Sequence, residues 1–102
     1  MGEIFFATDG PSALKIARDK QPDLILLDVE MPGMTGYDVC QQMKQEPLLS
    51  DVAIIFVTSH QSMEHEVRAL EVGAVDFITK PLNPPIVRAR VRTHLTLKQQ
   101  SD

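Results

Sequence analysis

A run of four apolar residues, Leu24 to Leu27, constrains the fold of this chain more than any other feature. An uninterrupted apolar run of this length predicts a short strand that is buried on both faces. Asp28 follows the run directly, and a loop with proline and glycine, Met31 to Gly36, comes after it. Open α/β sheets bind their ligands beyond the carboxyl ends of the strands, so Asp28 stands where such proteins carry their chemistry.

Two further apolar runs end in polar residues that suit the same edge. Thr58 follows Ala53 to Val57, and Lys80 follows the segment Val75 to Thr79. The carboxyl ends of parallel strands meet at one edge of a sheet, so Asp28, Thr58 and Lys80 are expected to lie together. An Asp beside a hydroxyl group and an ammonium group predicts a site that can be phosphorylated.

Strand and helix patterns alternate along the whole chain. The predicted strands are Glu3 to Thr8, Leu24 to Leu27, Val52 to Val57 and Val75 to Ile78. The predicted helices are Pro11 to the residue before Pro22, Tyr37 to Gln45, Met63 to Val72 and Pro84 to Gln100. In the last helix an apolar stripe repeats every four residues, at Val87, Val91 and Leu95. Four β-α units with apolar strands predict an α/β fold whose parallel sheet is covered on both faces.

Size and charge exclude several classes of protein. A chain of 102 residues buries roughly 60–70% of the surface that it exposes when unfolded, so we expect one domain over residues 1–102. The net charge of -4 argues against nonspecific binding to nucleic acid or to an anionic membrane. One cysteine, Cys40, excludes an internal disulfide, and no apolar run is long enough to span a membrane. We expect a cytoplasmic protein.

The motifs together resemble the receiver domain of two-component response regulators. The matching segments are Thr8 to Leu14, Leu24 to Gly36, Ala53 to Ser59, Ala69 to Pro81 and the final helix. The spacings from Asp28 to Thr58 and from Thr58 to Lys80 also fit that family. The resemblance implies a flavodoxin-like fold, with a doubly wound parallel sheet.

The resemblance assigns a role to each residue of the predicted site. Asp28 matches the acceptor of a phosphoryl group that comes from a sensor histidine kinase or a phosphotransfer protein. Thr58 matches the hydroxyl group that bonds a phosphoryl oxygen. Lys80 matches the cation that pairs with the acceptor and then with the phosphoryl group. Phe77 matches the aromatic residue that turns inward on activation, so Thr58 and Phe77 would form the switch.

The resemblance also implies a Mg²⁺ ion, held by Asp28, an acidic pair and a backbone carbonyl, here that of Glu30 with its side chain in solvent. In the family the acidic pair ends a strand that precedes the segment matching Glu3 to Thr8, and it has no counterpart here. We therefore expect a receiver that lacks the family's first strand and helix, with an incomplete metal site and slow or absent phosphorylation. Structural roles are implied for Gly36 and for Pro81, which a cis bond often precedes in the family.

In the family the missing strand lies in mid-sheet, between the segments that match Glu3 to Thr8 and Leu24 to Leu27. Without it, strand edges and apolar surface would be exposed, which favours pairing with another chain. We expect either self-association, as a homodimer for example, or a rearrangement that places Glu3 to Thr8 on a neighbouring strand.

The predicted function is a phosphoacceptor switch in a phosphorelay, not an enzyme beyond its own phosphorylation and dephosphorylation. A receiver-like interaction module that works without phosphorylation is the alternative. A phosphatase with an aspartate nucleophile would want a second Asp where Glu30 stands, and a nucleotide-binding or flavin-binding domain would want a glycine-rich phosphate loop. The ending Ala89 to Gln100 resembles receivers that a helical linker joins to cyclic di-GMP enzymes, which suggests a fused output domain.

Several of these residues also have a purely structural interpretation. Thr58 could cap the following helix, and Phe77 could be an ordinary core residue. His60, two residues after Thr58, could affect dephosphorylation or lie in a solvated loop. His65 and His94 are predicted to lie on the surfaces of helices.

Overall fold

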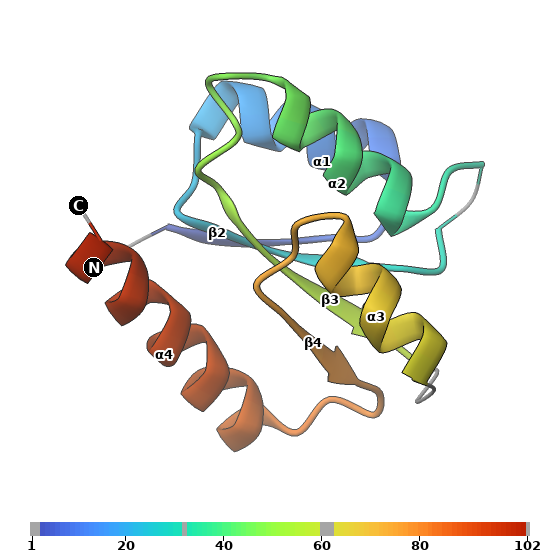
Figure 1. Ribbon diagram of the computed structural model, residues 1–102, viewed down its shortest axis with the longest axis vertical. Coiled ribbons are helices and arrows are strands. Elements are labelled where there is room, and N and C mark those ends of the chain that lie inside the picture. The colour runs from blue at the N-terminus through green and yellow to red at the C-terminus, as the bar shows by residue number, and fades with distance from the viewer. Residues whose placement is uncertain (1–2, 32, 60–62, 102) are drawn as a thin grey trace.

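The computed structural model of the chain describes residues 3–31, 33–59 and 63–101, with the side chains of 63–66 and 99–101 excepted. Strands and helices alternate along this part of the chain (Figure 1). The elements are β1 (Ile4–Ala7), α1 (Gly10–Lys20), β2 (Leu24–Asp28), α2 (Gly36–Gln45), β3 (Ala53–Thr58), α3 (Met63–Glu71), β4 (Asp76–Thr79) and α4 (Pro84–Ser101). The predicted order of four β-α units is confirmed.

The strands of the described residues form one parallel sheet in the order β1-β2-β3-β4. Asp28 pairs with Val57, and Thr58 pairs with Thr79, so the carboxyl ends of β2, β3 and β4 reach the same edge. β1 pairs directly with β2, from Ile4 opposite Leu24 onward. The first strand is therefore placed on a neighbouring strand, which is one of the two outcomes expected for it.

Helices cover the sheet on both faces because its central strands are apolar on both faces. Side chains alternate along β2: Ile25 and Leu27 face one core, and Leu24 and Leu26 face the other. The first core contains buried residues of α1, α2 and α3, and the second contains those of α4. Figure 1 shows α4 alone on its side of the sheet. This confirms the predicted doubly wound arrangement.

The stripe predicted on the last helix is the surface with which α4 packs on the sheet. Val91 is buried in the second core, and Val87 and Leu95 pack against it. On the same face of the sheet, Ile4 and Phe6 of β1 are 40% and 43% exposed. The sheet is thus well covered over β2 and β3 and partly open over β1. Among the described residues, no helix is long and apolar enough to cross a membrane.

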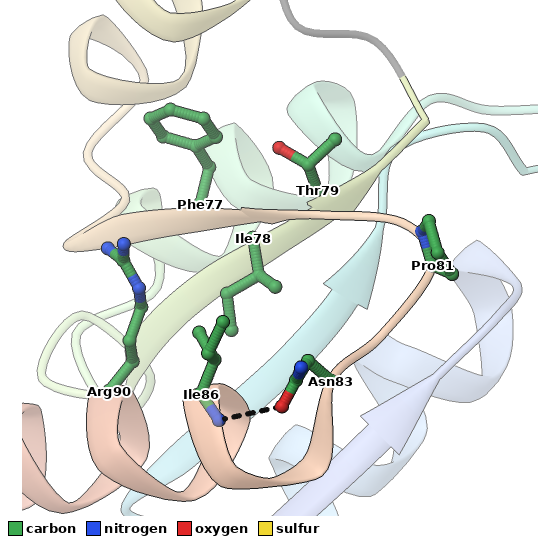
Figure 2. A pocket seen from close by; sticks show the side chains of 7 residues that line it. All are labelled: Phe77, Ile78, Thr79, Pro81, Asn83, Ile86 and Arg90. Atoms are coloured by element: carbon green, nitrogen blue, oxygen red, sulfur yellow. Dashed lines mark hydrogen bonds between the residues drawn. The ribbon is translucent and has the colours of Figure 1, made fainter.

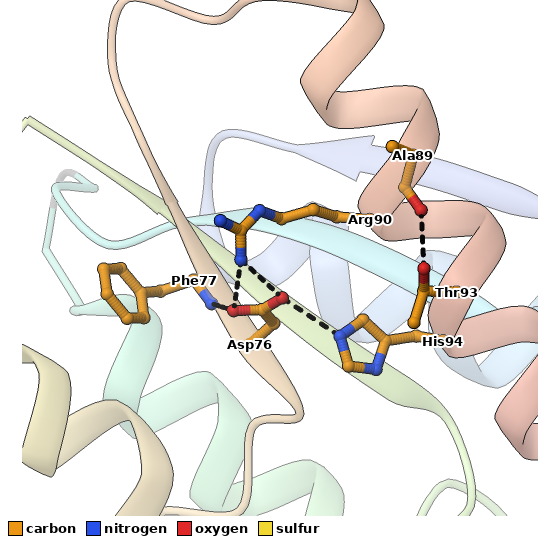
Figure 3. A network of polar contacts seen from close by, with 6 residues as sticks. All are labelled: Asp76, Phe77, Ala89, Arg90, Thr93 and His94. Carbon is orange, nitrogen blue, oxygen red and sulfur yellow. Dashed lines mark hydrogen bonds and ion pairs between the residues drawn. The ribbon is translucent and has the colours of Figure 1, made fainter.

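A polar network fixes α4 to β4 (Figure 3). The Asp76 carboxylate accepts hydrogen bonds from Arg90, at 3.1 and 3.2 Å, and its Oδ2 lies 3.0 Å from Nε2 of His94. The His94 side chain is only 16% exposed, so its prediction as a surface residue was wrong. Helix periodicity alone could not show that an aspartate of β4 would face it. Burial raises the pKa of Asp76, but hydrogen bonds from His94, from the Phe77 N–H and from Arg90 outweigh this and lower it.

The loop between Asp28 and α2 is held tightly at its end. Thr35 and Asp38 form a capping box, in which the Asp38 N–H donates to Thr35 Oγ1 and the Thr35 N–H donates to Asp38 Oδ2. The Gly36 N–H donates to the Val29 carbonyl at 3.0 Å. A Cβ atom at Gly36 would lie 2.7 Å from the Asp28 carbonyl oxygen and 3.0 Å from the Val29 Cα. Gly36 thus permits the close approach of α2 to the end of β2, which agrees with the structural role implied for it.

Replacing Gly36 with alanine is expected to lower the free energy of unfolding by about 1–3 kcal/mol. The added methyl group would meet backbone atoms of β2, which cannot move without disturbing the sheet. Urea unfolding of the variant measures the loss. Gly10→Ala is the matched control and should lose less, because its methyl group would mainly meet the flexible side chain of Met34. Equal losses in both variants would contradict this explanation.

Replacing Asp76 with asparagine is expected to lower the free energy of unfolding at pH 7 by about 1 kcal/mol. The pKa of Asp76 is lower in the folded chain than its ordinary value of 3.8. Its contribution is therefore complete above that value and is lost as the pH falls through the folded pKa. Urea unfolding from pH 7 down to pH ~3 should show the difference between the two proteins shrinking at the acid end. Asp19→Asn, at an exposed position of α1, should show no such trend.

Candidate functional site

The three residues predicted to share one edge of the sheet do so. Asp28 ends β2 and is 8% exposed, Thr58 ends β3 and is 2% exposed, and Lys80 follows β4 directly. The Lys80 ammonium group donates to Asp28 Oδ2 at 2.8 Å, and the Lys80 backbone N–H donates to the Thr58 carbonyl at 2.7 Å. The three residues are far apart in the sequence, and the parallel register of the strands brings them to one edge.

Electrostatic contacts hold the lysine and the aspartate together. The hydrogen bond to Asp28 raises the pKa of Lys80 against a smaller effect of desolvation, and the charges of Asp28 and Glu30 add to the rise. The other carboxylate oxygen, Asp28 Oδ1, accepts a hydrogen bond from the Glu30 N–H at 3.1 Å. Each oxygen of Asp28 thus has a donor, so the carboxylate is fixed in orientation at the edge of the sheet.

Glu30 is exposed, as predicted for its side chain, but this side chain also takes part in the cluster. Glu30 Oε1 accepts hydrogen bonds from Thr58 Oγ1 at 3.1 Å, from Ser59 Oγ at 3.1 Å and from the Ser59 N–H at 3.3 Å. Burial raises the pKa of Glu30, but hydrogen bonds from its own backbone, from Ser59 and from Thr58 lower it overall. The position of Glu30, two residues beyond Asp28, was the only signal for this contact in the sequence.

The described residues do not supply a complete set of metal ligands at this edge. No group of three or more His, Cys, Asp or Glu side chains suited to a metal ion occurs among them. Asp28 and Glu30 are the carboxylates of the cluster, and both accept hydrogen bonds from protein donors. In their present arrangement these residues do not fit a Mg²⁺ site built from three acidic side chains.

The chain beyond Lys80 turns sharply into α4. The Lys80–Pro81 peptide bond is cis, which confirms what the resemblance implied for Pro81. Figure 2 shows a hollow between the end of β4 and the start of α4. Its volume is about 330 Å³, and its lining residues are Phe77, Ile78, Thr79, Pro81, Asn83, Ile86 and Arg90. Thr79 and Pro81, the residues on either side of the lysine of the site, therefore both line the hollow.

Phe77 lies on the other side of β4 from Ile78 (Figure 2). It is half-buried and packs against the first core, on the face that carries α3. A switching role for Phe77 stays a prediction. His60 lies outside the described residues, as does the side chain of His65.

Comparison with known proteins gives the same family from sequence and from structure. A sequence model of the response regulator receiver domain matches residues 1–92. The response regulator PleD of Caulobacter vibrioides is 42% identical over 91 residues, which are 89% of this chain and 20% of PleD. A protein of Vibrio cholerae named as a probable cyclic di-GMP phosphodiesterase is 41% identical over 96 residues, which are 94% of this chain and 22% of that protein. The chain thus spans about a fifth of the length of these relatives.

Solved structures agree with this result. The signal receiver domain of a signal transduction histidine kinase from Syntrophus aciditrophicus has a TM-score of 0.81 and 30% identity, over 94% of this chain and 91% of that one. The chemotaxis response regulator CheY4 of Vibrio cholerae has a TM-score of 0.84 and 23% identity, over 92% of this chain and 98% of that one, and supports the fold. From the matched residues and the shared fold, the chain belongs to the response regulator receiver domains of two-component signalling.

Proposed function

We propose that residues 1–102 act as one receiver domain and that Asp28 accepts a phosphoryl group from a sensor histidine kinase or a phosphotransfer protein. The observation that supports this proposal is the cluster at the edge of the sheet, where Lys80 and Thr58 flank a nearly buried Asp28. An aspartate that only capped a helix would not need an ammonium group at 2.8 Å. The chain then acts as a switch that modifies itself rather than as an enzyme with a turnover substrate.

The proposed reaction is an in-line displacement at phosphorus. An oxygen of Asp28 forms a bond to the phosphorus atom, while the bond from phosphorus to the donor nitrogen breaks and the nitrogen keeps the electron pair. A carboxylate is a weak nucleophile, so the site must position the phosphoryl group and neutralise its charge. Lys80 supplies one positive charge, directly beside the Asp28 oxygen.

The proposed switch needs more than one contact. A hydrogen bond from Thr58 to a charged phosphoryl group contributes about 1.5–3 kcal/mol. Reversing a two-state equilibrium from 1:99 to 99:1 takes about 5.5 kcal/mol. The Thr58 bond is therefore too weak to drive a full switch, and we propose that the Lys80 pair and repacking of Phe77 contribute the rest. Phe77 is suited to this because it stands three residues before Lys80 and is half-buried against the first core.

The alternative function, an interaction module that works without phosphorylation, also has an observation in its favour. The described residues of this edge do not form a three-carboxylate metal site, and Mg²⁺ typically assists phosphorylation in this family. In that case Asp28 and Lys80 would form a structural ion pair, and the surface formed by α3, β4 and α4 would bind the partner in every state of the chain.

The lengths of two relatives bear on the partners of this chain. The chain spans about a fifth of PleD and of the Vibrio cholerae relative, which supports a receiver attached to other domains. We propose that the output domain here metabolises cyclic di-GMP, as the name of the second relative says of that protein. A homodimer, through the surface of α3, β4 and α4, stays part of this proposal.

Incubation with acetyl phosphate and Mg²⁺ is expected to add one phosphoryl group to the chain, slowly because the metal site of the described residues is incomplete, and none to the Asp28→Asn variant. The physical reason is that the asparagine keeps the size of the side chain but lacks the nucleophilic oxygen. Intact mass measures the adduct, and circular dichroism checks that both proteins are folded. A folded chain that stays unmodified would contradict the proposed switch and favour the interaction module.

Replacing Lys80 with methionine is expected to slow adduct formation by about 100-fold, because the developing charge on the phosphoryl group loses its nearest cation. The rate is measured by the same mass assay over time. Lys15→Met, at an exposed position of α1, removes the same charge far from the edge and should react at the rate of the unmodified chain. Equal slowing in the two variants would point to net charge rather than to the Lys80 contact.

A further inference from the structure

The hydrogen-bond donors of Thr58 and Ser59, at the end of β3, are already bonded to a carboxylate. Thr58 Oγ1, Ser59 Oγ and the Ser59 N–H all donate to one atom, Glu30 Oε1, at 3.1, 3.1 and 3.3 Å. A hydroxyl group has one proton to donate, and so has a backbone amide. The donors on this side of Asp28 are therefore committed to a carboxylate of the chain itself.

A phosphoryl group on Asp28 would need the same donors. It brings strong acceptor oxygens and a charge of about -1.5 to -2. Lys80 reaches the Asp28 oxygen from the β4 side, and Thr58 and Ser59 end the neighbouring strand β3. The phosphoryl oxygens can bond to Thr58 or Ser59 only if Glu30 gives up those hydrogen bonds.

Electrostatic repulsion separates the Glu30 carboxylate from a phosphoryl group on Asp28. Glu30 follows Asp28 by two residues, and its backbone N–H donates to Asp28 Oδ1, so the two carboxylates share one edge of the sheet. Lys80 is the cation paired with Asp28, and the charge of Glu30 also acts on it. A second anion beside Glu30 would repel it while competing for the same donors.

We infer that the Glu30 carboxylate is an internal competitor of the phosphoryl group: it occupies Thr58 and Ser59 in the unmodified chain and must leave them when Asp28 is phosphorylated. This inference rests on the proposed phosphorylation of Asp28. Glu30 then acts as a positioning residue that holds the unmodified state, and its release moves a charged side chain away from the end of β3. The strength of its hydrogen bonds sets how readily the chain is modified.

Glu30→Gln tests the inference, because glutamine keeps the length and an acceptor oxygen but not the charge. A hydrogen bond to a neutral acceptor is roughly half as strong as one to a carboxylate, so the phosphoryl group should displace the glutamine more easily. With acetyl phosphate and Mg²⁺, the adduct should form roughly 10-fold faster than in the unmodified chain. Glu71→Gln, at an exposed position of α3, is the charge-matched control and should not change the rate.

Two readouts separate the competition from a general effect of charge. The NMR signal of the Ser59 amide should differ between the unmodified chain and Glu30→Gln, because this amide donates to the Glu30 carboxylate. The gain in rate from Glu30→Gln should also shrink when Thr58→Val is already present, since a residue that acts through Thr58 loses its effect without it. A gain of the same size in both backgrounds would overturn the inference.

The outcomes for the inference and for the proposed function are distinguishable. An adduct that depends on Asp28 and forms at the same rate or more slowly in Glu30→Gln overturns the competition and leaves the phosphoacceptor function standing. A Ser59 amide signal that is the same in Glu30→Gln and in the unmodified chain has the same meaning. No adduct in any variant of the folded chain overturns both. An adduct that forms faster in Glu30→Gln, with a changed Ser59 amide signal, supports both.

Discussion

The parallel pairing of β2, β3 and β4 is the constraint on which the site depends. Asp28, Thr58 and Lys80 belong to different β-α units, and each is directed to the same edge because its strand runs in the same direction as its neighbours. The pairing is held by burial on both faces, since every residue of β2 and β3 is buried. The apolar core therefore determines the geometry of a polar site at its boundary, and the backbone bond from Lys80 to Thr58 joins the ends of the neighbouring strands β3 and β4.

The site at this edge combines two carboxylates with one ammonium group. Two carboxylates, Asp28 and Glu30, lie near one ammonium group, and the remaining donors come from Thr58 and Ser59. Hydrogen bonds to ionised groups are stronger than those between neutral groups, so each donor here helps to fix a charged side chain. Asp28 and Glu30 are thus held by donors before any modification, and Thr58 and Ser59 could bond a new anion only by releasing Glu30.

The opposite end of the same structure is fixed by a second polar network. Asp76 of β4 holds Arg90 and His94, so α4 stays on its face of the sheet through ionic as well as apolar contacts. The hollow at the start of α4 is lined by Arg90 of this network, by Pro81 next to Lys80 and by Phe77. β4 therefore carries contacts of the site at one end and contacts of α4 at the other.

The sequence by itself determined the four β-α units, the apolar stripe of α4 and the edge residues Asp28, Thr58 and Lys80, because strand and helix periodicity are local properties of a chain. Only the tertiary structure decided where β1 pairs, that Glu30 turns back to Thr58 and Ser59, and that His94 meets Asp76. Each of these depends on side chains or edges brought together from distant segments. A polar side chain takes whichever donor or acceptor the fold places within reach, and no pattern of neighbouring residues specifies that partner.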